Sequence, residues 1–186
     1  MNFPELPQPR PTLRIYMGLP GCGKTTAARA WCAEDPDHRI RINRDDTRAT
    51  LGCLPLGSAS QECAITAMHH GGAADLLTLG WSVVCDDTNL RSDVQAAWLT
   101  LAQAVGATFV LIDMTDVPVS VCINRVAQRA AGGGRDVSPH VIKTMAKRYG
   151  LPDDTDHHGR RIAGSDTFDA ACSILDGQGL LRDASK

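Results

Sequence analysis

The segment from Gly18 to Thr25, GLPGCGKT, fits the pattern G-x-x-x-x-G-K-[ST], whose chemistry is the binding of nucleotide phosphates. Its glycines allow the backbone to wrap around phosphates, and the N–H groups at the start of a following helix supply a positive field. Lys24 would reach the outer phosphates, and the hydroxyl of Thr25 would bind Mg²⁺. We expect the following residues to bind ATP or another nucleoside triphosphate: Gly18, Gly21, Cys22, Gly23, Lys24, Thr25 and Thr26.

A second candidate region is INRDDTR, Ile42 to Arg48, which contains two carboxylates and two guanidiniums. Asp45 lies just beyond a predicted strand, and ligands of an open parallel sheet bind at the carboxyl ends of its strands. Asp45 would therefore lie beside the phosphate loop, where a carboxylate can accept a proton from an attacking hydroxyl. Arg48 could hold a phosphate of the acceptor or orient Asp45. Arg44 and Asp46 are interpreted as solvated flanks.

The segment VVCDDTN, Val83 to Asn89, has the same character at the end of another predicted strand. An apolar run that ends in aspartate is typical of the Mg²⁺ side of phosphoryl-transfer sites. Two neighbouring carboxylates, Asp86 and Asp87, could take that role, and the other one would be a strand-end or capping residue.

Arg125 and Arg129 are separated by four positions, so they lie one above the other on a predicted helix. Arginines that face a phosphate site would neutralise charge on the transferred group. From the spacing alone, a solvated amphipathic helix is the more ordinary interpretation. The glycines at 132–134 would give the flexibility that a closing lid needs.

The elements that must position these residues alternate between strand and helix. Strands are predicted over Thr12–Met17, Arg39–Ile42, Ser82–Cys85 and Thr108–Ile112. Helices are predicted over Lys24–Glu34, Ser60–Leu79, Asp93–Val105, Val119–Ala131 and Val137–Tyr149. Strands separated by helices favour a parallel sheet with both faces covered. The expected fold class is therefore α/β, with about four to five parallel strands flanked by helices.

The composition is that of a soluble globular protein, with 43% hydrophobic and 22% charged residues and a net charge of −2. No bulk basic charge indicates nucleic-acid binding, so any such binding must be local. The cysteines are odd in number and contain no C-x-x-C pair, which favours reduced thiols in the cytoplasm. No run is long enough to span a membrane, and no membrane partner is expected.

Residues 1–11 are rich in proline and are expected to form an extended tail. The pair His69 and His70 has no partner at metal-ligand spacing, so solvated helix positions are expected for both. The three tryptophans, Trp31, Trp81 and Trp98, are interpreted as core or helix–sheet packing residues.

Five segments, taken in order, resemble the kinase domain of the phage polynucleotide 5′-kinase/3′-phosphatase family. They are GLPGCGKTT, INRDDTR, DDTNL, DMTDVPVSVCINRVAQR and VSPHVIKTMAKRYGLP. The resemblance covers most of residues 12–152 and implies a P-loop kinase fold with a helical lid. It also implies transfer of the γ-phosphate of ATP, with Mg²⁺, to a 5′-hydroxyl end of RNA or DNA. If the chain is phage-encoded, its location would be the host cytoplasm.

Carried over by position, the resemblance assigns a role to each candidate residue. Lys24 and Thr25 would serve the nucleotide and the metal, and Asp45 would be the general base. Arg48 would contact the phosphate on the 3′ side of the acceptor. Asp87, with Thr88 and Asn89, would support the acceptor, and Asp87 would also face the metal. Arg129, with Arg125, would stabilise the transferring phosphate.

The phage family continues into a phosphatase domain that opens on an apolar strand and D-x-D-G-T. Here residues 153–186 are expected to be an extension with a possible last strand at Ala170–Leu175. The segment Ser173–Leu181 lies where the phosphatase opening would fall, but Gln178 stands at the second aspartate, so phosphatase activity is not expected.

Two alternatives remain open at this level. The same chemistry could act on a nucleoside, a small alcohol or a hydroxyl on a modified DNA base. The chain could also be a non-catalytic module whose P-loop changes shape with the bound nucleotide. The sequence leaves the oligomeric state open.

Overall fold

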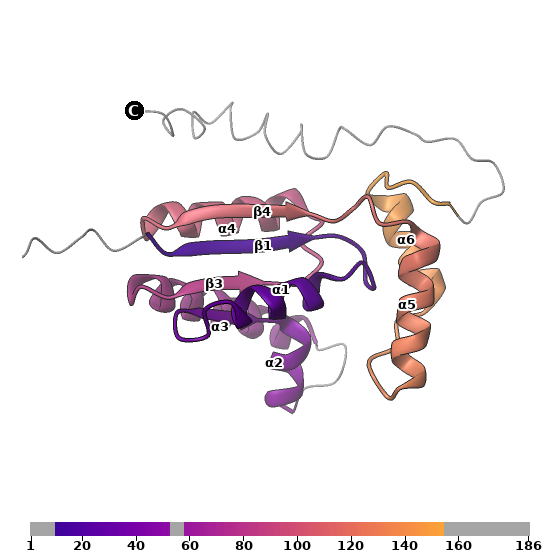
Figure 1. The fold of residues 1–186 in the computed structure, drawn as a ribbon, viewed down its shortest axis with the longest axis horizontal. Coiled ribbons are helices and arrows are strands. Elements are labelled where there is room, and N and C mark those ends of the chain that lie inside the picture. Colours follow the sequence, from indigo (N-terminus) through magenta and orange to yellow (C-terminus); the bar gives the residue numbers. More distant parts are fainter. Residues whose placement is uncertain (1–9, 53–57, 155–186) are drawn as a thin grey trace, which may run out of the picture.

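A computed structural model of the chain describes residues 10–52 and 58–154. Four strands form one parallel sheet in the order β2-β3-β1-β4. They are β1 (Thr12–Met17), β2 (Arg39–Ile42), β3 (Ser82–Cys85) and β4 (Thr108–Asp113). Every crossover carries at least one helix, so all four strands end at the same edge of the sheet (Figure 1).

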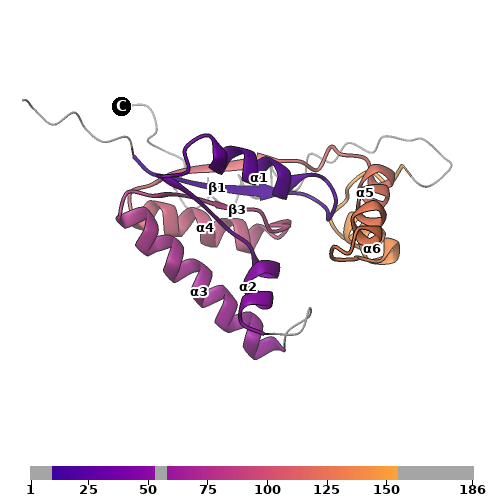
Figure 2. The same ribbon diagram turned by 60° about the horizontal axis from the view of Figure 1, so that its bottom comes forward.

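Six helices complete the described part of the chain. They are α1 (Lys24–Ala33), α2 (Arg44–Thr50), α3 (Ala59–Thr78), α4 (Ser92–Ala104), α5 (Val119–Ala131) and α6 (Pro139–Arg148). Helices α3 and α4 cover one face of the sheet and α1 lies on the other, while α5 and α6 stand beyond the ends of the strands (Figure 2). The expected α/β fold with a four-stranded parallel sheet and flanking helices is confirmed.

The alternation of side chains along the strands explains the two covered faces. Leu13 and Ile15 of β1 are fully buried against α3 and α4, in a cluster with Leu77 and Trp98. Tyr16 points to the opposite face and packs in a smaller cluster with Ala28 and Trp31 of α1. The expected packing role of Trp31 and Trp98 is therefore confirmed.

A third cluster fixes the loop after β1 against the two helices beyond the sheet. Leu19 and Cys22 of the loop are buried with Val119, Cys122 and Val126 of α5. The buried residues Ile142 and Ala146 extend the same cluster into α6. The phosphate loop is therefore packed against the helices that were expected to form a lid.

Helix α2 is the element that the sequence pattern did not predict. It begins at Arg44, where the side chain of Asn43 accepts hydrogen bonds from the backbone N–H groups of Asp45 (3.0 Å) and Asp46 (3.2 Å). An Asn cap followed by acidic residues in the first turn stabilises a helix start. INRDDTR is therefore a strand end, a cap and a short helix.

Several expectations concern parts of the chain outside the described residues. They are the tail over residues 1–9, the possible strand at Ala170–Leu175 and the segment Ser173–Leu181. Within the described residues, none of the helices combines the length and the apolar character that crossing a membrane requires.

Candidate active site

The loop Gly18–Lys24 depends on backbone conformations that favour glycine. Gly21 has a φ of 88°, and a Cβ at this position would lie 2.3 Å from the carbonyl oxygen of Cys122. Gly23, with a φ of 113°, is the N-cap residue of α1. The absence of side chains lets the loop approach α5 closely and turn into the helix, which is the geometry of a phosphate cradle.

Lys24 is the buried cation of this loop, with only 6% of its surface exposed. Its ammonium donates hydrogen bonds to the carbonyl oxygens of Gly18 (2.9 Å) and Leu19 (2.8 Å). A buried ammonium is costly unless its hydrogens are satisfied, and the two carbonyls supply that satisfaction. Phosphate oxygens are stronger acceptors of the same hydrogens, so the ammonium is available to a nucleotide.

The two candidate arginines of α5 have different partners. The Nη1 group of Arg125 donates to the carbonyl oxygen of Cys22 at 3.2 Å, so this guanidinium lies on the phosphate loop. Arg129 instead donates from Nε to the carbonyl oxygen of Arg135 at 3.0 Å, within the segment that joins α5 to α6. The structure thus brings Arg125, and not Arg129, to the loop.

Asn43 connects α2 to the end of β3 as well as capping the helix. Its amide nitrogen donates to Asp86 Oδ1 at 3.0 Å and to Asp87 Oδ1 at 3.3 Å. The backbone N–H of Arg44 also donates to Asp87 Oδ1, at 3.0 Å. These bonds hold the start of α2 against the carboxylates that follow β3, a role for Asn43 that the sequence analysis missed.

Asp45, the expected base, lies in the first turn of α2 and has two arginine partners. Arg48 Nη1 donates to Asp45 Oδ1 at 2.6 Å, one helical turn further on. Arg135, from the segment between α5 and α6, forms an ion pair with the same oxygen. The carboxylate therefore lies between the helix that carries it and the expected lid, and its other oxygen, Oδ2, takes no part in either contact.

Glu62 of α3 organises the arginines of α2 and was not recognised from the sequence. Its two carboxylate oxygens accept from Arg48 Nε (2.7 Å) and Arg48 Nη2 (2.8 Å), which is a two-pronged pair. The hydrogen bond from Arg48 is the main reason that the pKa of Glu62 falls from 4.5 to about 2. The pairing with Glu62 likewise raises the pKa of Arg48.

Arg44, expected to be a solvated flank, is a further partner of Glu62. Its Nη2 group donates to Glu62 Oε2 at 2.5 Å, and its Nη1 group donates to Thr66 Oγ1 at 2.8 Å. The expectation was wrong because α2 presents this side chain to α3. Asp46 is exposed and pairs with Arg41, in agreement with the expected solvated position.

The two aspartates after β3 have different surroundings. The side chain of Asp86 is fully buried, and its Oδ1 atom lies 3.0 Å from Arg41 Nε. Asp87 lines a cleft, and burial is the main cause that raises its pKa from 3.8 to about 6. Asp87 is therefore the carboxylate of the two that faces open space, and Asp86 is a structural partner of Arg41.

Thr88 and Asn89 connect the segment after β3 to β1 and to the phosphate loop. The backbone N–H of Gly18 donates to the carbonyl oxygen of Thr88 at 3.0 Å. Asn89 adopts a positive φ of 42°, and its amide donates to the carbonyl oxygen of Tyr16 at 2.9 Å. The expected acceptor residues are thus joined by hydrogen bonds to β1 and to the loop that follows it.

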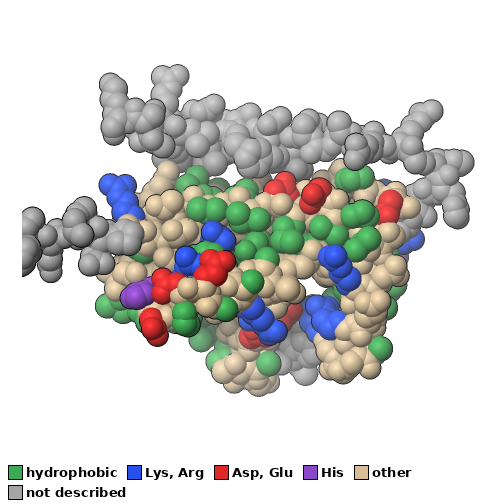
Figure 3. Space-filling view, in the orientation of Figure 1, with side chains coloured by type: hydrophobic (Ala, Val, Ile, Leu, Met, Phe, Trp, Pro, Cys, Tyr) green, Lys and Arg blue, Asp and Glu red, His purple; other side chains and the backbone are tan. Residues whose placement is uncertain are grey.

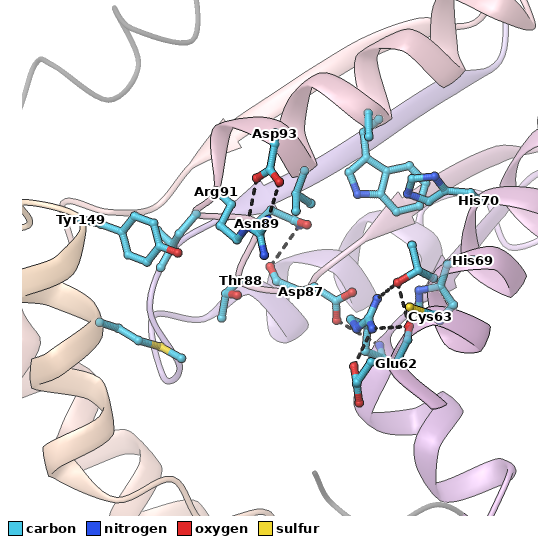
Figure 4. Close-up of a pocket in the computed structure, with 17 residues that line it drawn as sticks. Glu62, Cys63, His69, His70, Asp87, Thr88, Asn89, Arg91, Asp93 and Tyr149 are labelled. Atoms are coloured by element: carbon cyan, nitrogen blue, oxygen red, sulfur yellow. Dashed lines mark hydrogen bonds and ion pairs between the residues drawn. The ribbon is translucent and has the colours of Figure 1, made fainter. Parts of the chain in front are cut away.

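A cleft of about 540 Å³ opens beside these residues, between α3, α4, α6 and the end of β3. Figure 4 shows Glu62, Cys63, His69 and His70 along the α3 wall, Asp87 and Thr88 at the centre, and Tyr149 on the far side. His69 was expected to be solvated, but it is 5% exposed. Burial is the main cause that lowers its pKa from 6.5 to about 4.

No group of three His, Cys, Asp or Glu side chains in the described ranges is arranged to bind a metal ion on its own. Magnesium in phosphoryl-transfer sites is ordinarily bound through one or two protein oxygens, water and substrate phosphates.

The chain is similar to one family model and to several solved structures. A family model for an AAA domain, AAA_33, matches residues 13–152. A chain of the Pnkp1/Rnl/Hen1 RNA repair complex is 26% identical, with a TM-score of 0.68, over 79% of this chain and 46% of that one. A second Pnkp1/Rnl/Hen1 structure is 29% identical, with a TM-score of 0.57, over 65% of this chain and 40% of that one. The chain spans less than half the length of these RNA repair chains.

A small-molecule kinase has the same fold. The APS kinase of Mycobacterium tuberculosis, in complex with AMPPNP and APS, is 17% identical, with a TM-score of 0.53, over 92% of this chain and 99% of that one. At this identity the likeness concerns the P-loop kinase fold alone.

Proposed function

The chain belongs to the AAA domain family AAA_33, and we propose that it is an ATP-dependent polynucleotide 5′-hydroxyl kinase. The reaction would transfer the γ-phosphate of ATP to a 5′-hydroxyl end of RNA or DNA. The observation that carries the proposal is the contact of Asp45 with Arg48, because Arg48 also pairs with Glu62, which lines the cleft. Thr88, another residue of the cleft, is hydrogen-bonded to Gly18 of the phosphate loop. The likeness to a chain of an RNA repair complex favours a nucleic-acid acceptor.

On the donor side, the residues of the loop fit a nucleoside triphosphate. The glycine cradle and the ammonium of Lys24 would hold the outer phosphates, and Arg125 would add positive charge beside Cys22. Thr25, at the start of α1, and Asp87 would hold Mg²⁺ together with phosphate oxygens. The ion would neutralise charge that develops on the transferred group.

On the acceptor side, Asp45 would receive the proton of the attacking 5′-hydroxyl. Arg48 would bind the phosphate on the 3′ side of the reacting nucleoside, held in orientation by the two-pronged pair with Glu62. Thr88 and Asn89 would position the sugar. Arg129 would reach the transferring phosphate only after leaving the carbonyl oxygen of Arg135, which is a movement of the expected lid.

One observation favours a smaller acceptor as the second candidate. Glu62 and Asp45 already neutralise Arg48, so the cleft does not require an acceptor that carries a phosphate. On the face seen in Figure 3, the Lys and Arg side chains are dispersed among acidic and apolar ones rather than gathered in a band. A nucleoside or a small alcohol would suit such a surface.

The test is transfer of labelled γ-phosphate from ATP, with Mg²⁺, to four acceptors. They are a 5′-hydroxyl oligoribonucleotide, a 5′-hydroxyl oligodeoxynucleotide, a 3′-mononucleotide and a free nucleoside. We expect label on the first three, and a loss of about 10²- to 10⁴-fold in Asp45→Asn, the range for a general base. Asp46→Asn, one residue away and exposed, is the matched control and should change the rate less than about 2-fold.

Each other outcome points to one alternative. Label on the free nucleoside alone would mean that the acceptor is a nucleoside or a small alcohol, and the proposed kinase chemistry would stand. No transfer to any acceptor, together with ATP hydrolysis that is indifferent to Asp45→Asn, would indicate a nucleotide-dependent binding module.

A further inference from the structure

Two neighbouring aromatic rings form part of the cleft lining. The rings of His70 on α3 and Trp98 on α4 lie 4.3 Å apart between centroids, with 50° between their planes. Both residues line the cleft, with the apolar side chains of Val94 and Ala97 beside them. Trp98 is 3% exposed, so its position is fixed by the core, and His70 is the half-buried partner.

The same cleft also carries charged groups. Arg44, Glu62 and Asp87 line it, as does the ion pair of Arg91 and Asp93. The positive charge of Arg44 is one of the causes that lower the pKa values of His69 and His70. Burial is the larger cause for both, and it lowers the pKa of His70 as it does that of His69. At neutral pH both imidazoles are therefore uncharged rings, each with one donor and one acceptor nitrogen.

The hydrogen bonds of His69 leave His70 as the ring that is free to face a ligand. Thr47 Oγ1 donates to the carbonyl oxygen of Asn43 at 2.9 Å, and His69 Nε2 lies 2.7 Å from the same hydroxyl. Because the single hydroxyl hydrogen is used, His69 Nε2 is the donor in that contact. His69 thereby anchors α3 to α2, and its neighbour His70 lies against Trp98.

We propose that the part of the cleft lined by His70 and Trp98 is a subsite for the nucleobase of the acceptor's terminal nucleoside. The proposal rests on the proposed kinase function and adds to it the part of the acceptor that is recognised beyond the hydroxyl. A cleft lined by flat neutral rings as well as by charged groups matches a nucleotide, whose base is flat and uncharged and whose sugar–phosphate is charged. Its volume of about 540 Å³ leaves room for a base and its sugar.

A ring platform selects for the presence of a base more than for its identity. Stacking depends on the π-face that every base has. The enzyme is therefore expected to accept all four bases and to discriminate against an abasic end. A simple alcohol would lose the same contact, so the subsite also separates nucleoside acceptors from small alcohols.

The experiment compares a 3′-mononucleotide with the matching abasic sugar 3′-phosphate, both as phosphate acceptors and as ligands in equilibrium binding. In the wild-type protein we expect the base to increase kcat/KM and affinity by roughly 10-fold or more. In His70→Ala the ratio between the two acceptors should fall below about 3-fold, and in His70→Phe, which keeps a flat ring, it should be restored. His140→Ala, an exposed histidine on α6 outside the cleft, should leave the ratio unchanged.

The two readouts separate failure of the subsite from failure of the proposed function. Transfer to both acceptors with equal efficiency would overturn the subsite and leave the kinase intact. Binding that depends on the base and on the ring at position 70, without transfer to any acceptor, would support the subsite and overturn the kinase. A ratio that falls equally in His70→Ala and His70→Phe would assign His70 a packing role and overturn its role as a platform.

Discussion

The donor and acceptor sides of the candidate site are built in different ways. The donor side is one continuous loop in which backbone carbonyls hold Lys24 and glycine conformations set the path of the chain. The acceptor side is assembled from side chains of α2, α3, the end of β3 and the segment before α6. A loop of this kind is specified locally, whereas the acceptor network exists only when distant elements have packed.

This difference has a consequence for charge. In the donor loop one ammonium is satisfied by neutral carbonyls, so a phosphate meets an uncompensated positive charge. On the acceptor side each arginine already has a carboxylate partner: Glu62 for Arg44 and Arg48, and Asp45 for Arg48 and Arg135. Binding of a donor should therefore depend more strongly on charge than binding of an acceptor, and the following four changes test that contrast.

The largest effect is expected from removing the charge of the donor loop. Lys24→Met eliminates the ammonium that we propose binds the phosphates, and we expect kcat/KM for ATP to fall by about 10²- to 10³-fold. Acceptor affinity, measured with a 3′-mononucleotide in the absence of ATP, should change less than about 2-fold. Lys147→Met on the exposed side of α6 is the control. An equal loss of acceptor affinity would contradict the separation of the two sides.

The acceptor side should show the stronger dependence of stability on acidity. Because burial lowers the pKa of His69 from 6.5 to about 4, the unfolded chain binds a proton between pH 6.5 and pH 4 that the folded protein does not bind. His69 should thus contribute a fall of about 3 kcal/mol in the free energy of unfolding as the pH drops from 6.5 to 4, while Asp87, whose pKa is raised from 3.8 to about 6, contributes in the opposite direction. Urea titrations of the wild type and of His69→Gln would show the contribution of His69 as the difference between the pH dependences of the two proteins. His38→Gln, at an exposed position, should keep the wild-type slope.

The donor loop should also be sensitive to shape. In Gly21→Ala the new Cβ would clash with the carbonyl oxygen of Cys122, and we expect about 1–3 kcal/mol of destabilisation. Gly80→Ala is the matched control, since Gly80 has a φ of 89° but open space around it. It shares the backbone cost of a positive φ without the clash, and its loss of stability in thermal unfolding should be smaller. Equal losses would remove the steric explanation.

The smallest effect concerns the orientation of Arg48. Glu62→Gln breaks the two-pronged pair while keeping the size of the side chain, so Arg48 gains freedom to move. We expect KM for an oligonucleotide acceptor to rise by about 10-fold with KM for ATP unchanged. Glu34→Gln, in an exposed pair with Arg39, is the control. A fall in the acceptor KM would mean that Glu62 competes with the acceptor instead of positioning Arg48.

The same contrast explains what could be predicted from the sequence. The strands, the loop and the order of elements follow from local periodicity and from one motif, and their expected bounds lie within a residue or two of the observed ones. Helix α2 was missed because its seven residues have no apolar periodicity. The signal that could have found it is Asn43 followed by two acidic residues, a helix-start pattern.

Glu62 and the burial of His69 had no local signal of any kind. Both lie on α3, and their importance arises from contacts with α2 that a single sequence does not encode as a pattern. For Arg129 the sequence did carry a local signal, its spacing of four residues from Arg125 on one helix. It did not show the hydrogen bond to the carbonyl oxygen of Arg135, which directs the Arg129 side chain toward the expected lid.

The hydrogen bond from the N–H of Gly18 to the carbonyl oxygen of Thr88 joins the two sides through backbone atoms alone. A substitution at position 88 keeps the carbonyl oxygen that accepts this bond, so the connection does not depend on which side chain stands there. The cleft can therefore change a side chain that faces a substrate while this residue keeps its backbone contact with the phosphate loop.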